Sequence, residues 1–243
     1  MSDVEAKCWI CSSSGPLSGE HLPKASNIRD FFGKISPDKP VYLTTIERDA
    51  RPIHSAKSDK LKTRDVICIP CNTARSQQFD DAWMMLSREL RKRLPTLRDG
   101  QKLRGNAVFP YDTRRELLAV HLFFVKVLGC HLAAAGISEF DLASLANAIM
   151  NERAHPGLFL QIGFGVTMNG ALHMGTSGFE KHATATGVKF GIWCYSVGGY
   201  SVMVALVDYN QPTVPNDWCP KGWWHPRSGN WLTIADFSGD SDP

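Results

Sequence analysis

Two Cys-x-x-Cys pairs, far apart in the chain, constrain the fold more than any other feature of this sequence. The first pair is Cys8 and Cys11, and the second is Cys68 and Cys71. Four thiolates make up the tetrahedral ligand set of a closed structural zinc site. The alternatives are four unrelated buried thiols or a redox-active pair. Because two pairs occur, we interpret these cysteines as a structural zinc site with no position open to a substrate.

A zinc ion bound by both pairs would bring the segments beside them together. Closing the long loop of residues 12–67 with a metal removes much entropy from the unfolded chain. Just inside the pairs lie Glu20 and His21 on one side and Asn72 on the other. A carboxylate, an imidazole and an amide oxygen are groups from which hydrolytic metal sites are built.

The order Cys-x-x-Cys, Glu20-His21-Leu22-Pro23-Lys24 and Cys-x-x-Cys-Asn72 resembles the HNH nuclease pattern, whose fold is called ββα-metal. The resemblance covers about residues 8–90. It implies that His21 is the general base, a role for which an imidazole has a suitable pKa. Glu20 and Asn72 are then candidate ligands for a catalytic Mg²⁺ or Mn²⁺ ion, and Ser76, one helical turn further on, is another.

Each of these residues also has a plainer interpretation. His21 and Glu20 fit ordinary surface positions, and Asn72 fits the N-cap of a helix. The middle asparagine of the HNH pattern usually lies shortly before the second cysteine pair, where this chain has Thr63. Its role in orienting the base would then fall to Thr63, to Asp65 or to His54.

The charge distribution favours a polyanionic partner, for which we expect DNA. Residues 1–120 carry 21 Lys and Arg against 15 Asp and Glu, whereas the rest of the chain carries 6 against 9. Basic side chains near the proposed site would contact phosphates without reading sequence, or would form a solvated surface. These residues are Lys57, Lys60, Lys62, Arg64 and Arg75.

The pattern of apolar residues predicts an α+β protein with two domains. Residues 1–95 are expected to form a zinc-stabilised ββα-metal module with strands in 17–24 and 65–69. A helix at about 74–92, capped by Asn72-Thr73, follows them, and residues 25–62 read as an irregular insertion with one strand at 41–46. Residues 96–243 are expected to form an α+β domain of unknown role.

In the second domain, apolar periodicity predicts helices at 114–135 and after the N-cap segment 138–141, then an antiparallel sheet. Strands are expected at 158–166, 189–196 and 200–207, with a last edge strand at 231–234 and a hairpin across Gly198-Gly199. The tryptophans near the C-terminus would stack on bases or close the sheet core. These are Trp218, Trp223, Trp224 and Trp231. The tail 238–242 is predicted to be disordered.

The helix at 114–135 is apolar enough to raise the question of a membrane. His121, Lys126 and His131 interrupt it, so we expect a buried or interface helix, and residues 113–150 are a candidate homodimer seam. An odd count of seven cysteines and a polar N-terminus indicate a cytoplasmic protein with metal-bound cysteines.

The leading hypothesis from sequence is a metal-dependent HNH-type endonuclease that hydrolyses phosphodiester bonds in DNA. The alternative is a zinc-stabilised module that has kept the scaffold, lost the chemistry and binds nucleic acid or protein.

Overall fold

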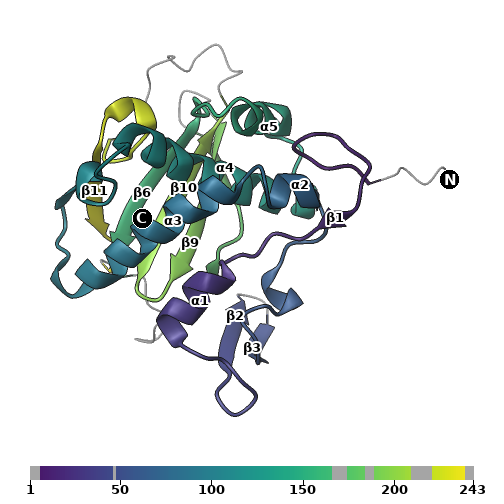
Figure 1. Ribbon diagram of the computed structural model, residues 1–243, viewed down its shortest axis with the longest axis horizontal. Coiled ribbons are helices and arrows are strands. Elements are labelled where there is room, and N and C mark those ends of the chain that lie inside the picture. Colours follow the sequence, from purple (N-terminus) through teal and green to yellow (C-terminus); the bar gives the residue numbers. More distant parts are fainter. Residues whose placement is uncertain (1–5, 46–47, 166–173, 184–188, 209–220, 239–243) are drawn as a thin grey trace.

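The computed structural model describes residues 6–45, 48–165, 174–183, 189–208 and 221–238. Its helices and strands confirm the mixed α+β class: long helices lie across one face of a twisted sheet (Figure 1). The first helix and a small two-stranded sheet, residues 25–53, project from one side of this two-layered body.

The main sheet has the strand order β5-β11-β6-β10-β9-β7, and β8 also pairs with β9. Neighbouring strands are antiparallel, except that β11 runs parallel to β6. The strands are β5 (Lys102–Arg104), β6 (Leu158–Phe164), β7 (Met174–Thr176), β8 (Glu180–Ala183), β9 (Lys189–Val197), β10 (Tyr200–Val207) and β11 (Trp231–Asp236). The expectation that the last strand is an edge strand is wrong, because β11 lies between β6 and β5.

The predicted hairpin between β9 and β10 is confirmed. Tyr200 pairs with Val197 across the two-residue turn, and Gly198 and Gly199 both have positive φ angles, 62° and 113°. Side chains other than glycine rarely adopt such angles, which explains the Gly-Gly pair. A Cβ atom on Gly198 would also lie 1.9 Å from the ring of Phe31, so α1 packs directly against this turn.

Two long helices cover the sheet, and a third follows them. They are α3 (Gln77–Arg93), α4 (Thr113–Ala135) and α5 (Leu142–Met150). Among the described residues α4 is the one helix long and apolar enough to cross a membrane, but 78% of its most apolar window is buried inside the protein. The side chain of Asp141 caps α5 by accepting a hydrogen bond from the Ala143 N–H, as the sequence predicted.

The elements near the cysteines differ in detail from expectation. Strands β1 (Leu17–Ser18) and β4 (Ile67–Cys68) pair as predicted, but Cys71 lies in a separate short helix, α2 (Ile69–Asn72), that begins directly after Cys68. The helix after it begins at Gln77 with Ser76 as N-cap, so the prediction of a cap at Asn72-Thr73 is wrong.

The insertion is also more regular than expected. It contains α1 (Ala25–Phe32), β2 (Val41–Thr45) and β3 (Arg48–Ile53), which form a satellite cluster around Ile28 and Ile53. Single-turn 3₁₀ helices occur at Asp59–Leu61, Leu94–Thr96, Gly105–Ala107 and Pro226–Ser228.

The hydrophobic core runs across the predicted domain boundary at residues 95/96. Trp83 of α3 is fully buried and its ring packs against Phe123 and Phe124 of α4 and Tyr195 of β9, with centroid separations of 4.8–5.7 Å. Trp224 is buried in the same core, which favours the structural interpretation of this tryptophan. Trp218 and residues 239–242 of the tail lie outside the described residues.

The first cysteine turn docks on α4 through a close contact. Trp9 lies against Gly129 and its indole Nε1–H donates to the Cys130 sulfur at 3.2 Å. A Cβ atom on residue 129 would lie 2.2 Å from the Trp9 ring. Glycine weakens a helix, so its presence here is explained by the space that the indole needs.

We therefore expect opposite effects of Gly129→Ala in two backgrounds. In the wild type the new methyl group collides with Trp9 and lowers the free energy of unfolding by about 1–3 kcal/mol. In a Trp9→Ala background the same substitution raises it by up to about 1 kcal/mol, because alanine favours the helix. Urea unfolding of the zinc-loaded proteins measures both. Stabilisation in both backgrounds would contradict the docking contact.

Candidate zinc site and the adjacent charge network

The four cysteines of the two pairs meet at one place. Their Sγ atoms all lie within 4.8 Å of one another, and those of Cys11 and Cys68 are 3.6 Å apart. Zn–S bonds of about 2.3 Å in a tetrahedron put neighbouring sulfurs about 3.8 Å apart. The cluster therefore fits a zinc ion, as predicted from the spacing.

Backbone hydrogen bonds position these cysteines. Leu17 pairs with Cys68 across β1 and β4, and the Trp9 N–H donates to the Val66 carbonyl at 3.0 Å, which ties the first turn to the second strand. Cys71 follows one turn later in α2. Burial raises the pKa of the Cys8 and Cys71 thiols. A divalent cation among them would supply the charge that holds them as thiolates.

Glu20 lies close to this cluster in sequence but is engaged by cations of the protein itself. Its carboxylate is 1% exposed and forms ion pairs with the ammonium groups of Lys24 at 2.5 Å and Lys126 at 3.4 Å. Asp80 joins both lysines, at 2.7 Å each. We call Glu20, Lys24, Asp80 and Lys126 the charge network.

The charge network is balanced, with two carboxylates and two ammonium groups. Burial alone would raise the pKa of Glu20, but the charges of Lys126 and Lys24 outweigh it and hold that pKa below its usual value. Glu20 and Asp80 in turn outweigh burial and raise the pKa of Lys24. A divalent ion at Glu20 would have to displace at least one ammonium group.

Ser76, the further candidate ligand, also belongs to this arrangement. Its hydroxyl is buried and accepts a hydrogen bond from the Lys126 ammonium at 3.2 Å. Lys126 itself is 0% exposed although it lies in the middle of the apolar helix α4. The position at which an ion was expected to meet Glu20 and Ser76 is thus taken by a lysine.

Asn72 holds the end of β1. Its Nδ2 donates to the Ser18 hydroxyl at 3.1 Å and lies 3.5 Å from the Gly19 carbonyl. Thr63 makes two hydrogen bonds to the backbone of Glu20. Its hydroxyl accepts from the Glu20 N–H, and its own N–H donates to the Glu20 carbonyl. The two backbone segments lie so close together that position 19 has room only for glycine. A Cβ atom there would lie 2.3 Å from the Thr63 carbonyl oxygen. These hydrogen bonds of Thr63 go to Glu20, and the role of Thr63, Asp65 or His54 in orienting a base at His21 stays a prediction.

His21 is half-buried, and its Nε2 atom is buried without a hydrogen-bond partner. Its backbone pairs with Lys62 in an isolated bridge. Burial, followed by the charge of Lys62, lowers the pKa of His21, so the imidazole is neutral near pH 7. A neutral imidazole with an unpartnered nitrogen has the protonation state that a general base needs.

The basic residues predicted to contact phosphate have varied surroundings. Arg64 donates to the Ala134 carbonyl at the end of α4, Lys62 pairs with Asp59 at 2.7 Å, and Arg75 contacts the Met150 sulfur. Lys57 and Lys60 are exposed.

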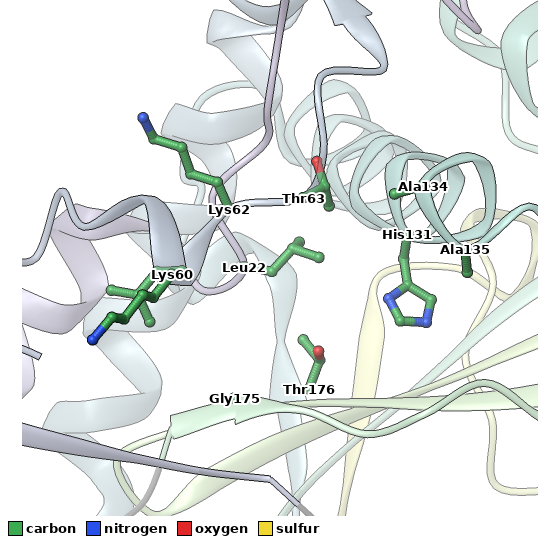
Figure 2. A pocket seen from close by; sticks show the side chains of 10 residues that line it. Leu22, Lys60, Lys62, Thr63, His131, Ala134, Ala135, Gly175 and Thr176 are labelled. Carbon is green, nitrogen blue, oxygen red and sulfur yellow. The ribbon is translucent and has the colours of Figure 1, made fainter. Parts of the chain in front are cut away.

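A cavity of about 340 Å³ lies between this segment, the end of α4 and β7. Figure 2 shows the His131 ring and Thr176 directed into it, while the ammonium groups of Lys60 and Lys62 point away from its centre. Burial lowers the pKa of His131. With its cations turned outward, the cavity offers one neutral imidazole and two threonines on a wall that is polar and apolar in about equal parts.

A second group of titratable residues, His121, His155 and His225, lies under α5 and the last 3₁₀ helix. The His155 Nε2 lies 2.8 Å from the Ser144 hydroxyl, which suggests a serine–histidine pair. However, the His155 Nδ1 accepts from the Gly157 N–H, so Nε2 carries the proton and donates to Ser144. That tautomer cannot activate a serine. Burial lowers the pKa of His155 and of His225 to about 4, and both are structural.

Three members of the charge network were not identified from sequence: Lys24, Asp80 and Lys126. One signal was available, because Lys126 is a single lysine inside an apolar helical run. A buried lysine needs a carboxylate partner, and the interrupting charge therefore indicated one. Which carboxylate it meets depends on the packing of α4 against α3 and the loop after β1.

Comparison of the chain with protein-family models, with curated proteins and with solved structures returns no match. The description of the site therefore rests on its own residues.

We expect the protein to bind one zinc ion per chain and to lose it when Cys71 is replaced by serine. The loss should also lower the free energy of unfolding by several kcal/mol, because metal binding is coupled to folding. Cys194→Ser is the matched control, since Cys194 lies outside the cluster. Metal analysis of the purified proteins and urea unfolding measure both. Retention of stoichiometric zinc by Cys71→Ser would contradict a four-cysteine site.

Removal of the buried ammonium group should be costly. Lys126→Met is expected to lower the free energy of unfolding by about 3–5 kcal/mol, because it leaves excess buried negative charge. Lys92, an exposed lysine 3.6 Å from the half-buried Glu89, provides the control: Lys92→Met should lower the free energy of unfolding by less than about 1 kcal/mol.

A double variant tests the pairing itself. Adding Glu20→Gln to Lys126→Met restores neutrality, because Lys24 and Asp80 remain paired. The double variant should therefore be less destabilised than the sum of the two single variants in urea unfolding. Additive losses would mean that the two groups are not coupled.

Proposed function

We propose that the chain is a nucleic-acid-binding protein whose zinc-stabilised N-terminal part keeps an HNH-like scaffold without a catalytic ion. The observation that carries this proposal is the engagement of Glu20 by two lysine ammonium groups. A carboxylate that is 1% exposed and already neutralised has little affinity left for Mg²⁺ or Mn²⁺. Glu20 then serves to attach the loop after β1 to α3 and α4.

Support for a nucleic acid as the partner comes from charge. The excess of basic residues in the first half of the chain suits a phosphate backbone, and Lys57, Lys60 and Arg75 are available on its surface. Such contacts supply affinity without sequence readout, so we expect binding that weakens steeply with salt.

The HNH-type endonuclease is the second candidate, and His21 favours it. The buried Nε2 of this neutral imidazole has no partner, and Asn72 lies beside the strand end that leads to it. In that mechanism His21 would deprotonate a water molecule for attack on a phosphodiester. A divalent ion would stabilise the charge on the phosphate, and Asn72 with Ser76 or Glu20 would have to bind it after a lysine had moved.

One experiment separates the two candidates. The zinc-loaded protein and its His21→Ala variant are mixed with a fluorescent duplex and with plasmid DNA, with and without Mg²⁺ or Mn²⁺. For a binding protein we expect salt-sensitive binding that is unchanged by His21→Ala or by the metal, and intact plasmid. The matched control is His54→Ala, because His54 is an exposed histidine in the neighbouring insertion.

Cleavage by the wild type that needs the divalent ion and disappears in His21→Ala, but not in His54→Ala, would replace the binding proposal with the endonuclease. Absence of both binding and cleavage at low salt would contradict both candidates.

A further inference from the structure

A hollow of about 420 Å³ lies on the surface where α4 begins, beside the segment after α5 and the last 3₁₀ helix. Four arginines line it: Arg114, Arg115, Arg153 and Arg227. We call it the arginine hollow. Its size falls within the range of small-molecule sites, and it is too large for a single inorganic anion.

The charge of the arginine hollow is strongly unbalanced. Among the described residues that line it, Glu152 is the one carboxylate, and its Oε1 accepts a hydrogen bond from Gln78. Within the described part of the chain, Arg114 and Arg153 have neither an ion pair nor a hydrogen bond from the guanidinium. Arg114 and Arg153 thus bring two uncompensated positive charges to the same hollow, which is unfavourable until an anion joins them.

Stability of the fold does not explain the positions of these cations. Arg114 and Arg115 lie in the first turn of α4, where the helix dipole is positive and a cation is unfavourable. Glu116 in the same turn offsets only part of that charge. The helix N-terminus and the arginines therefore both favour the binding of an anionic ligand.

Two further features narrow the ligand class. The floor of the hollow is apolar, with Leu118, Ala154 and Pro226. Arg227 is held in place, because its Nε lies 3.2 Å from the His225 Nδ1 and its Nη2 donates to the Pro156 carbonyl at 3.0 Å. A fixed planar guanidinium suits bidentate binding of phosphate and stacking on a flat ring.

We propose that the arginine hollow binds a phosphate ester that carries a flat apolar group, as in one nucleotide unit of a nucleic-acid strand or a free nucleotide. The arginines contact the phosphate, and the base or sugar lies on the apolar floor. Where the source is a strand, this inference rests on the proposed function and gives the place at which the strand is held.

The hollow adjoins the zinc-bearing end of the protein, as a strand-binding surface requires. Gln78 of α3 donates to Glu152, and the Arg115 Nη2 lies 3.4 Å from the Gln78 Oε1. Arg75, shortly after the second cysteine pair, contacts Met150 at the end of α5. Arg75 is therefore a further exposed cation close to the segment that lines the hollow.

The test uses the full zinc-loaded chain and a double variant, Arg114→Gln with Arg153→Gln. The control is Arg29→Gln with Lys34→Gln, which removes the same charge from exposed residues on and just after α1. Fluorescence anisotropy with a labelled single-stranded oligonucleotide measures strand binding at several salt concentrations. Adenosine monophosphate, followed by the arginine Nε–Hε NMR signals, tests the free nucleotide. Poly-L-glutamate as competitor tests for a carboxylate polyanion.

We expect the double variant to bind the oligonucleotide about tenfold or more weakly, with the salt slope reduced by about 2, whereas the control stays near wild type. Adenosine monophosphate should shift arginine signals in the wild type and the control but not in the double variant. Poly-L-glutamate should compete poorly.

The other outcomes separate this inference from the proposed function. Equal loss of oligonucleotide binding in the double variant and the control, or no loss in either, would overturn the arginine hollow as the strand site while leaving the proposed function intact. Nucleotide shifts that need Arg114 and Arg153, without oligonucleotide binding, would support the hollow and overturn the proposed function. Equal competition by poly-L-glutamate would overturn recognition of a phosphate ester.

Discussion

Helix α4 places the ammonium group of Lys126 inside the core, and the surrounding chain has to supply partners for this buried charge. An isolated buried cation is unfavourable by many kcal/mol, so carboxylates and hydroxyls must converge on it. Glu20, Asp80 and Ser76 do so, and they come from the loop after β1 and from the start of α3. One side chain thus fixes how the end with the cysteine cluster sits on the helical layer.

The cysteine cluster and the charge network act on neighbouring parts of the same loop. The cysteines hold the strand ends of β1 and β4, and the lysines hold the residues that follow β1. Trp9, between the first two cysteines, packs into the notch at Gly129 on the same helix that carries Lys126. The segment around His21 is therefore fixed from two sides, whether it serves in binding or in catalysis.

The sequence predicted the features that depend on local pattern. The cysteine spacing indicated the cluster, apolar periodicity indicated α4, and Gly198-Gly199 indicated the hairpin. It did not reveal α1 in a polar insertion or the interior position of β11, because both depend on contacts with distant strands. Glu20 shows the limit most clearly: its motif resembles that of a metal ligand, and only the packing of α4 reveals its two ammonium partners.

The position of Lys126 has a consequence for the order in which the chain can mature. Glu20, Lys24 and Asp80 leave the ribosome long before residue 126, and together they carry one unmatched negative charge. The cysteines can take up zinc at that stage, yet the loop beside them cannot close into a dry interior. The N-terminal segment can therefore reach its final packing only after α4 has been synthesised. We expect a fragment that ends at residue 95 to keep Glu20 and Asp80 in contact with water.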